Sequence, residues 1–127
     1  MAQPPPKPLL VFDGECRFCR RQKDRWRRLT IEAVDYQPFQ APGLAERFPE
    51  IPRAQYAAAV QLIVPDGTVY SGAEAVFRSL AHAPHRRWLA RCYASSPLFA
   101  CLSERAYRFI ARYRLAFSRL ARLGGGW

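Results

Sequence analysis

The chain has 127 residues, half of them hydrophobic, and a formal net charge of +10. This is the length of one domain, and a chain with so many apolar residues can build a core without disulfide cross-links. No apolar run approaches the roughly 18 residues of a membrane-spanning helix.

Residues 1–8 are rich in proline and are expected to form an extended or disordered lead. They lack the apolar stretch of a signal peptide, and we therefore expect a cytoplasmic protein. Cytoplasmic reductants keep structural thiols reduced. A Cys-x-x-Cys pair in that compartment is typical of catalysis or metal binding rather than of a static cross-link.

Two cysteines follow the first predicted strand, which covers residues 9–13 and is mostly apolar. Gly14 turns the chain, and Cys16 and Cys19 then stand three positions apart at the start of a predicted helix. Backbone N–H groups and the positive end of the helix dipole favour a thiolate in that first turn. Residues three apart share a face of a helix, so the two thiols could close into a disulfide. The arrangement predicts a redox dithiol.

The first helix should begin near Cys16 and carry a stripe on one side, formed by Phe18, Gln22, Trp26 and Leu29. Basic residues occupy its other side, and a second basic group lies on the last predicted helix. We expect solvent-exposed faces in both cases, with recruitment of an acidic partner, nucleic acid or a membrane surface as the alternative. The two groups are Arg20, Arg21, Lys23, Arg25, Arg27 and Arg28, and Arg105, Arg108, Arg112, Arg114, Arg119 and Arg122.

The middle of the chain alternates strand and helix signals. A strand is predicted within residues 31–39, centred on residues 33–36, and a short helix over residues 44–48. The apolar run at residues 57–64 predicts a third strand. A Pro-Asp-Gly turn at residues 65–67 then leads into a fourth strand, which indicates a hairpin.

Ser71 and Glu74 have the spacing of a capping box and predict a helix that Pro84 ends. The predicted order is then strand, helix, strand, helix, strand, strand, helix, which is the thioredoxin-like plan. We predict an α/β, three-layer, thioredoxin-like fold with a central mixed sheet of about four strands and an added C-terminal helical segment. One domain is expected over residues 9–123, followed by a flexible tail at residues 124–127.

Residues 86–123 have a helical pattern, with a break near residues 95–97. An apolar stripe in the last helix recurs with the α-helical period and is expected to pack on the rest of the domain. A helix lying on a membrane surface has the same combination of apolar stripe and arginines, and contact with a partner is another alternative. The stripe comprises Leu102, Ala106, Phe109, Ile110, Tyr113, Phe117 and Leu120.

Three motifs resemble those of the DCC family of thiol-disulfide oxidoreductases, formerly a domain of unknown function. The first is Asp-Gly-x-Cys-x-x-Cys after an apolar strand, at residues 13–19. The second is Gly-x-x-Tyr-x-Gly-x-x-Ala at residues 67–75, and the third is Tyr-Arg-x-x-Ala-Arg-x-Arg at residues 107–114. The resemblance spans roughly residues 9–120 and implies a small thioredoxin-like disulfide oxidoreductase.

Thiol–disulfide exchange proceeds by attack of a thiolate on a disulfide. Cys16 is nearer the start of the helix and is expected to be the more exposed thiol, so we assign the attack to Cys16 and resolution of the mixed disulfide to Cys19. Arg17 would favour the Cys16 thiolate, whereas Asp13 and Glu15 would oppose it. No cofactor or metal is expected beyond the dithiol. The expected partners are a protein or small-thiol disulfide and a reductant that the sequence does not identify.

Two residues of the motif have supporting roles. Asp13 would either pin the turn by accepting hydrogen bonds from backbone N–H groups or accept a proton from a thiol. Gly14 would allow a backbone conformation or a close approach that a side chain would block, which would keep the thiol side open to a substrate. Thioredoxin-like proteins usually place a cis-proline before the third strand, but residues 56–59 hold no proline. Substrate docking would then use a loop of different shape or other groups.

Two other classes of function remain open. The dithiol is also half of a zinc site, which His82 and His85 or Cys92 and Cys101 could complete. We expect instead that the histidines lie at a helix end and in a loop, and that the two cysteines are small packing residues, with a second disulfide between them as an alternative. The other class is a redox-inactive basic module for nucleic acid or an acidic partner, although its aromatic residues fall on predicted apolar faces.

Overall fold

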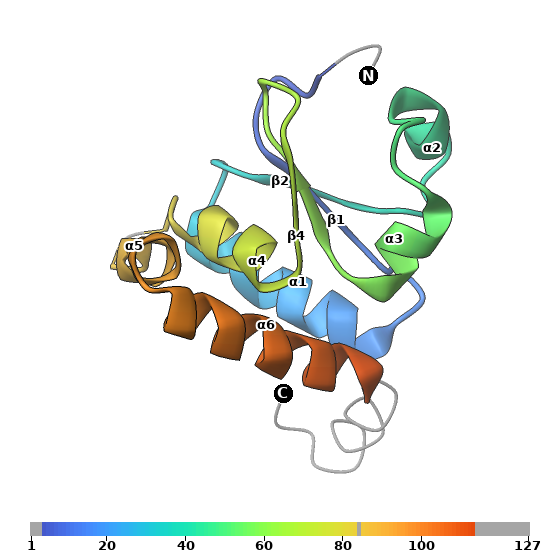
Figure 1. Cartoon of the computed structure of the whole chain (residues 1–127). Coiled ribbons are helices and arrows are strands. Elements are labelled where there is room, and N and C mark those ends of the chain that lie inside the picture. Colours follow the sequence, from blue (N-terminus) through green and yellow to red (C-terminus); the bar gives the residue numbers. More distant parts are fainter. Residues whose placement is uncertain (1–3, 84, 114–127) are drawn as a thin grey trace.

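The computed structural model describes residues 4–83 and 85–113, and within them four strands form one mixed sheet (Figure 1). The strands are β1 (Leu9–Phe12), β2 (Asp35–Pro38), β3 (Gln61–Ile63) and β4 (Val69–Ser71). They lie in the order β2-β1-β3-β4, with β1 parallel to β2 and antiparallel to β3, and β3 antiparallel to β4. The predicted α/β class and mixed sheet are confirmed, and the arrangement is compatible with a thioredoxin-like fold.

Helices cover both faces of the sheet (Figure 1). In the view of Figure 1, α2 and α3 lie on one side of it, and α1 and α4 lie on the other, with α6 running beyond them as an outer layer. This is the three-layer arrangement expected from the order of elements, with the C-terminal helices added to one side. Across the described residues the helices are α1 (Arg17–Thr30), α2 (Leu44–Arg47), α3 (Arg53–Ala58), α4 (Gly72–Leu80), α5 (Arg87–Ser95) and α6 (Pro97–Arg112).

The central strand β1 is buried on both faces, which explains why its sequence is apolar without alternation. Leu9 and Val11 belong to the core that α2 and α3 cover. Leu10 and Phe12 belong to the core on the opposite face, against which the half-buried Trp26 of α1 packs. Burial of β1 therefore fixes the point from which the chain turns into α1.

The residues that lead into β1 are held against the start of β2. Pro5 is buried, and the backbone N–H of Asp35 donates to the carbonyl of Pro8 at 2.8 Å. The Nζ of Lys7 lies 3.3 Å from the carboxylate of Asp35. Residues 4–8 are thus fixed by local contacts, and residues 1–3 lie outside the described part of the chain.

Two predicted strand positions need correction. β2 starts at Asp35, so the predicted centre at residues 33–36 is too early by about two residues. The third strand was predicted from residue 57, but Ala57 and Ala58 end the helix α3 and the strand begins at Gln61. Alanine has the highest helix propensity, which explains why these apolar residues continue a helix rather than start the strand. The predicted hairpin is confirmed, with the backbone N–H of Gly67 donating to the carbonyl of Val64 at 2.9 Å.

The predicted capping box at the start of α4 is wrong. Ser71 is the N-cap residue, but its side chain makes no capping bond and its hydroxyl donates to the buried Gln61. The cap comes from another helix: the Glu104 carboxylate on α6 accepts hydrogen bonds from the N–H groups of Ala73 and Glu74, at 3.0 and 3.4 Å. A helix N-terminus attracts a carboxylate through its dipole and its unpaired N–H groups, whichever element supplies it.

The break near residues 95–97 is confirmed. Ser96 caps α6 by accepting the N–H of Phe99 at 3.2 Å, and Pro97 occupies the first turn. Proline suits that position because its missing N–H would have no helical partner. The helices α5 and α6 are therefore separate elements that meet at Ser96.

The predicted packing stripe of α6 is largely wrong. Leu102, Phe109 and Tyr113 are 56%, 59% and 45% exposed, while Phe99 and Tyr107 are half-buried against α4 and its neighbours. Helical periodicity shows that a face is apolar, but the apolar surface of α6 is broad, and only the part that carries Phe99 and Tyr107 meets the fold. Phe117, Leu120, the end of the predicted domain at residue 123 and the tail at residues 124–127 lie outside the described residues. No helix within the described ranges has both the length and the hydropathy that crossing a membrane requires.

Candidate active site at the start of helix α1

Cys16 and Cys19 lie where β1 turns into α1, as predicted. Cys16 is the N-cap residue in an extended conformation, and its Sγ accepts a hydrogen bond from the backbone N–H of Cys19 at 3.2 Å. The first turn of α1 holds no acidic residue. A sulfur that accepts a helix N-terminal N–H is stabilised as a thiolate by that bond and by the helix dipole.

The exposure of the two thiols is opposite to the prediction. Cys16 is 4% exposed and therefore buried, whereas Cys19 is half-buried. An N-cap side chain folds back over the first turn to reach its N–H groups, which removes Cys16 from solvent. Arg17, which begins the helix beside Cys16, is half-buried.

A small hydrogen-bonded unit holds the turn before Cys16. The Oδ1 of Asp13 accepts the backbone N–H of Glu15 at 3.0 Å and the side-chain amide of Gln40 at 2.9 Å. The Oε1 of Gln40 in turn accepts the backbone N–H of Gly14 at 3.0 Å. Asp13 thus makes the backbone contact that its turn-pinning role requires. The sequence does not point to Gln40, which lies 26 residues from Gly14 along the chain.

Gly14 is needed for a close approach within the protein. A Cβ at this position would lie 2.6 Å from the Cβ of Pro38, a distance that side chains do not tolerate. The space beside Gly14 is therefore filled by Pro38 and Gln40, which confirms the predicted close approach at this position. Outside the turn, the Arg20 guanidinium donates to the Gly14 carbonyl at 2.8 Å.

A cleft of about 390 Å³ opens beside Cys19. Its walls come from α1, α3, α4 and α6 together with the segment that joins α3 to β3. The ring contact that joins α4 to α6 is part of this wall, with the centroids of Phe77 and Phe99 5.7 Å apart. The aromatic residues of the lining are Phe18, Trp26, Tyr56, Phe77, Phe99 and Tyr107. Volume and lining are both typical of a ligand site.

Tyr107 ties α6 to the loop before β3. Its hydroxyl accepts the backbone N–H of Val60 at 2.9 Å. Residues 58–60 line the cleft and overlap residues 56–59, the position at which a thioredoxin-like plan predicts a cis-proline. The described residues contain no cis peptide bond, so the loop is trans throughout. The sequence pointed to Tyr107 only as part of the C-terminal motif.

Tyr56 is a buried tyrosine in the same lining. It is 3% exposed, and its hydroxyl has no hydrogen-bond partner among the described residues. Burial raises the pKa of this phenol above its ordinary value, because the charged form would lose its hydration.

The other residues considered as metal ligands belong to α4, α5 and α6 or to the segments next to them, whereas the dithiol is at the start of α1. Cys92 on α5 is half-buried, but Cys101 on α6 is exposed, so the prediction that both are packing residues is wrong for Cys101. His82 follows α4 and His85 precedes α5, and both are exposed. Within residues 4–83 and 85–113, no three His, Cys, Asp or Glu side chains form a group that could hold a metal ion.

The basic face of α1 is mostly exposed, as predicted. Four of the six residues of this group, Arg20, Arg25, Arg27 and Arg28, are exposed. Arg21 and Lys23 are the two exceptions. The Lys23 side chain is only 17% exposed, and its ammonium lies 5.3 Å from the ring centre of Phe12.

Comparison with known proteins gave one result. Neither the curated proteins nor the solved structures contain a match to this chain. The model of one protein family, described as DCC1-like thiol-disulfide oxidoreductase, matches residues 10–120, which include the dithiol, the hairpin and α6. The chain therefore belongs to the DCC1-like thiol-disulfide oxidoreductase family.

Proposed function

We propose that the protein is a thiol–disulfide oxidoreductase of the protein-disulfide reductase type, which uses Cys16 and Cys19 as its redox dithiol. The observation that carries this proposal is the hydrogen bond from the Cys19 N–H to the Cys16 Sγ at the start of α1. This contact supports a Cys16 thiolate, and the thiolate is the reactive form in exchange. Membership of the family supports the same reaction class.

In the proposed reaction, the Cys16 thiolate attacks one sulfur of the substrate disulfide. A mixed disulfide forms, and the other substrate sulfur leaves as a thiolate that takes up a proton. The Cys19 thiolate then attacks the Cys16 sulfur, which releases the second substrate thiol and leaves a Cys16–Cys19 disulfide. Two electrons pass to the substrate, and an external thiol reductant must restore the dithiol. The reaction needs no cofactor beyond this pair, and cytoplasmic thiols would serve as the electron source.

Asp13 has a second proposed role beside its hydrogen bonds to the turn. Its carboxylate lines the same cleft as Cys19. A carboxylate in that position can accept the proton that Cys19 must lose before it attacks the mixed disulfide.

Trapping of the mixed disulfide tests the assignment of the two cysteines. In a background where Cys92 and Cys101 are changed to Ser, Cys19→Ser should accumulate a mixed disulfide on Cys16 with a model protein disulfide, whereas Cys16→Ser should accumulate none. Mass spectrometry after acid quenching identifies the linked cysteine. Trapping by Cys16→Ser alone would reverse the two roles. Equal turnover by the wild type and Cys16→Ser would contradict the enzymatic proposal.

A further inference from the structure

The cleft beside Cys19 provides apolar contact but few polar groups for orienting a ligand. Among its polar lining groups, the Tyr107 hydroxyl accepts the Val60 N–H, and Asp13 holds Glu15 and Gln40. These two groups are occupied by bonds within the chain, whereas the Tyr56 hydroxyl of the same lining is buried without a partner among the described residues. A small free ligand is normally oriented by convergent polar groups. The cleft therefore suits an apolar group whose position is fixed from elsewhere.

Exchange at the dithiol provides that fixation. A substrate in the mixed disulfide is covalently held at Cys16, one helical turn from the thiol that lines the cleft. A side chain near the reacting sulfur of a polypeptide would then contact the aromatic walls of the cleft and would need no hydrogen bonds to orient it. Removal of such a side chain from water stabilises the complex in proportion to its apolar area.

We propose that this cleft binds a large apolar side chain of a substrate polypeptide next to its reacting cysteine. The protein then prefers disulfides flanked by residues such as leucine and phenylalanine over those flanked by serine. This inference rests on the proposed function and adds the class of substrate to it. The helix α6 contributes the wall of the cleft that faces α1 and α4, so the C-terminal helical segment sets the preference.

Ala106 gives a way to narrow the cleft. It lines the cleft and is also exposed, so a larger side chain at this position can obstruct the mouth without being forced into the core. Ala94 on α5 is a matched control, because it is exposed and is not part of the lining. The pair Ala106→Phe and Ala94→Phe adds the same volume to two exposed helical positions.

The test measures single-turnover reduction of three disulfides by the reduced full-length chain, with acid quenching and alkylation of thiols. Two probes are disulfide-linked dimers of the tripeptides Leu-Cys-Phe and Ser-Cys-Ser, and the third is the small polar hydroxyethyl disulfide. Burial of one large apolar side chain predicts that the Leu-Cys-Phe dimer reacts about tenfold faster than the Ser-Cys-Ser dimer. In Ala106→Phe the ratio should fall to about twofold or less, whereas Ala94→Phe should keep both the wild-type ratio and the wild-type rate on hydroxyethyl disulfide.

The outcomes separate this inference from the function on which it rests. Equal rates for the two peptide dimers, with active reduction of hydroxyethyl disulfide, would overturn the apolar preference alone. No reduction of any of the three disulfides would overturn the proposed function itself. An unchanged peptide ratio in Ala106→Phe would show that the preference arises outside this cleft and would overturn the assignment.

Discussion

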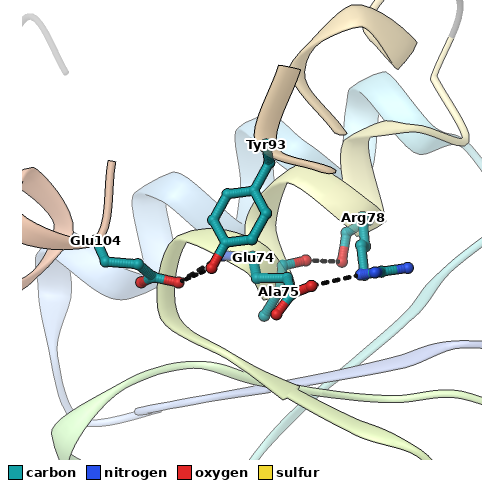
Figure 2. Close-up of polar contacts among 6 residues, drawn as sticks. Glu74, Ala75, Arg78, Tyr93 and Glu104 are labelled. Carbon is teal, nitrogen blue, oxygen red and sulfur yellow. Dashed lines mark hydrogen bonds and ion pairs between the residues drawn. The ribbon is translucent and has the colours of Figure 1, made fainter. Parts of the chain in front are cut away.

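The carboxylate of Glu104 on α6 caps α4 by accepting the backbone N–H of Ala73 at 3.0 Å. The same carboxylate accepts the hydroxyl of Tyr93 on α5 at 2.7 Å, as Figure 2 shows. One side chain thereby joins the helices α4, α5 and α6. Gly72 makes room for it, because a Cβ there would lie 2.7 Å from the Glu104 Oε1 and the backbone φ of 65° favours glycine.

Glu104→Gln should lower the free energy of unfolding by about 1–2 kcal/mol, because it removes a charge from the N-terminus of α4 and weakens hydrogen bonds to that charge. Urea unfolding followed by circular dichroism measures the change. Glu32→Gln, at an exposed position in the turn after α1, is the matched control and should alter stability by less than about 0.5 kcal/mol. A Glu104→Gln variant as stable as this control would contradict the capping role.

The stability of the fold should fall as the pH rises above about 10, the ordinary value for a tyrosine. Burial raises the pKa of Tyr36 and of Tyr56, and for Tyr93 burial and the Glu104 carboxylate both act in that direction. A folded-state pKa above that of the unfolded chain means that the folded state binds more protons in this range. The contribution is fully present below the unfolded pKa and is lost as the pH rises through the folded pKa.

Urea unfolding at several pH values between about 8 and 11, in the presence of a reductant, measures this slope. Tyr93→Phe should make the slope shallower, because one of the raised groups no longer titrates. A slope that Tyr93→Phe leaves unchanged would show that the ionisation of Tyr93 is not coupled to unfolding.

The strand β1 and the start of α1 could be predicted because their signals are local. An apolar run with a glycine and two cysteines after it determines where the strand ends and the helix begins. Gln40 could not be predicted, because its place beside Gly14 depends on pairing between distant strands. The parallel register sets Phe12 opposite Pro38, and this carries the two segments that follow into contact.

The exposed face of α6 could not be predicted either, because it too depends on contacts with distant segments. Leu98 and Phe109 on one face and Phe99 and Tyr107 on the other are all apolar or aromatic, so the period of the sequence is compatible with either face turned inward. Partners on α4 decide which face turns inward: Phe77 packs on Phe99, and Glu104 accepts a hydrogen bond from the Ala73 N–H at the start of α4. Periodicity within one helix contains no information on these partners.

Gln40→Ala should loosen the turn that leads to Cys16. The substitution removes the acceptor of the Gly14 N–H and a donor to Asp13, and we expect a loss of about 1–2 kcal/mol in the free energy of unfolding. Reduction of hydroxyethyl disulfide should slow severalfold, because the start of α1 would no longer be held in one position. Unfolding in urea and single-turnover rates measure the two effects.

Gln37→Ala is the matched control for this change, because Gln37 is exposed on β2 only three residues before Gln40. It should leave both the stability and the exchange rate close to those of the wild type. Equal behaviour of the two variants would show that the hydrogen bonds of Gln40 do not hold the turn.

Tyr107→Phe should weaken the link between α6 and the loop before β3. The buried Val60 would lose the acceptor of its N–H, and an unsatisfied buried N–H costs about 1–3 kcal/mol. Tyr113→Phe, at the exposed C-cap position directly after the same helix, also removes a tyrosine hydroxyl and should change stability by less than about 0.5 kcal/mol. Hydrogen exchange gives a local readout, because the Val60 amide should exchange at least about tenfold faster in Tyr107→Phe than in Tyr113→Phe. Since residues 58–60 also line the cleft, a loop freed in this way should reduce the preference for the apolar peptide dimer as well. A Val60 amide that stays as protected as in the control would mean that α6 is held against the loop by ring packing alone.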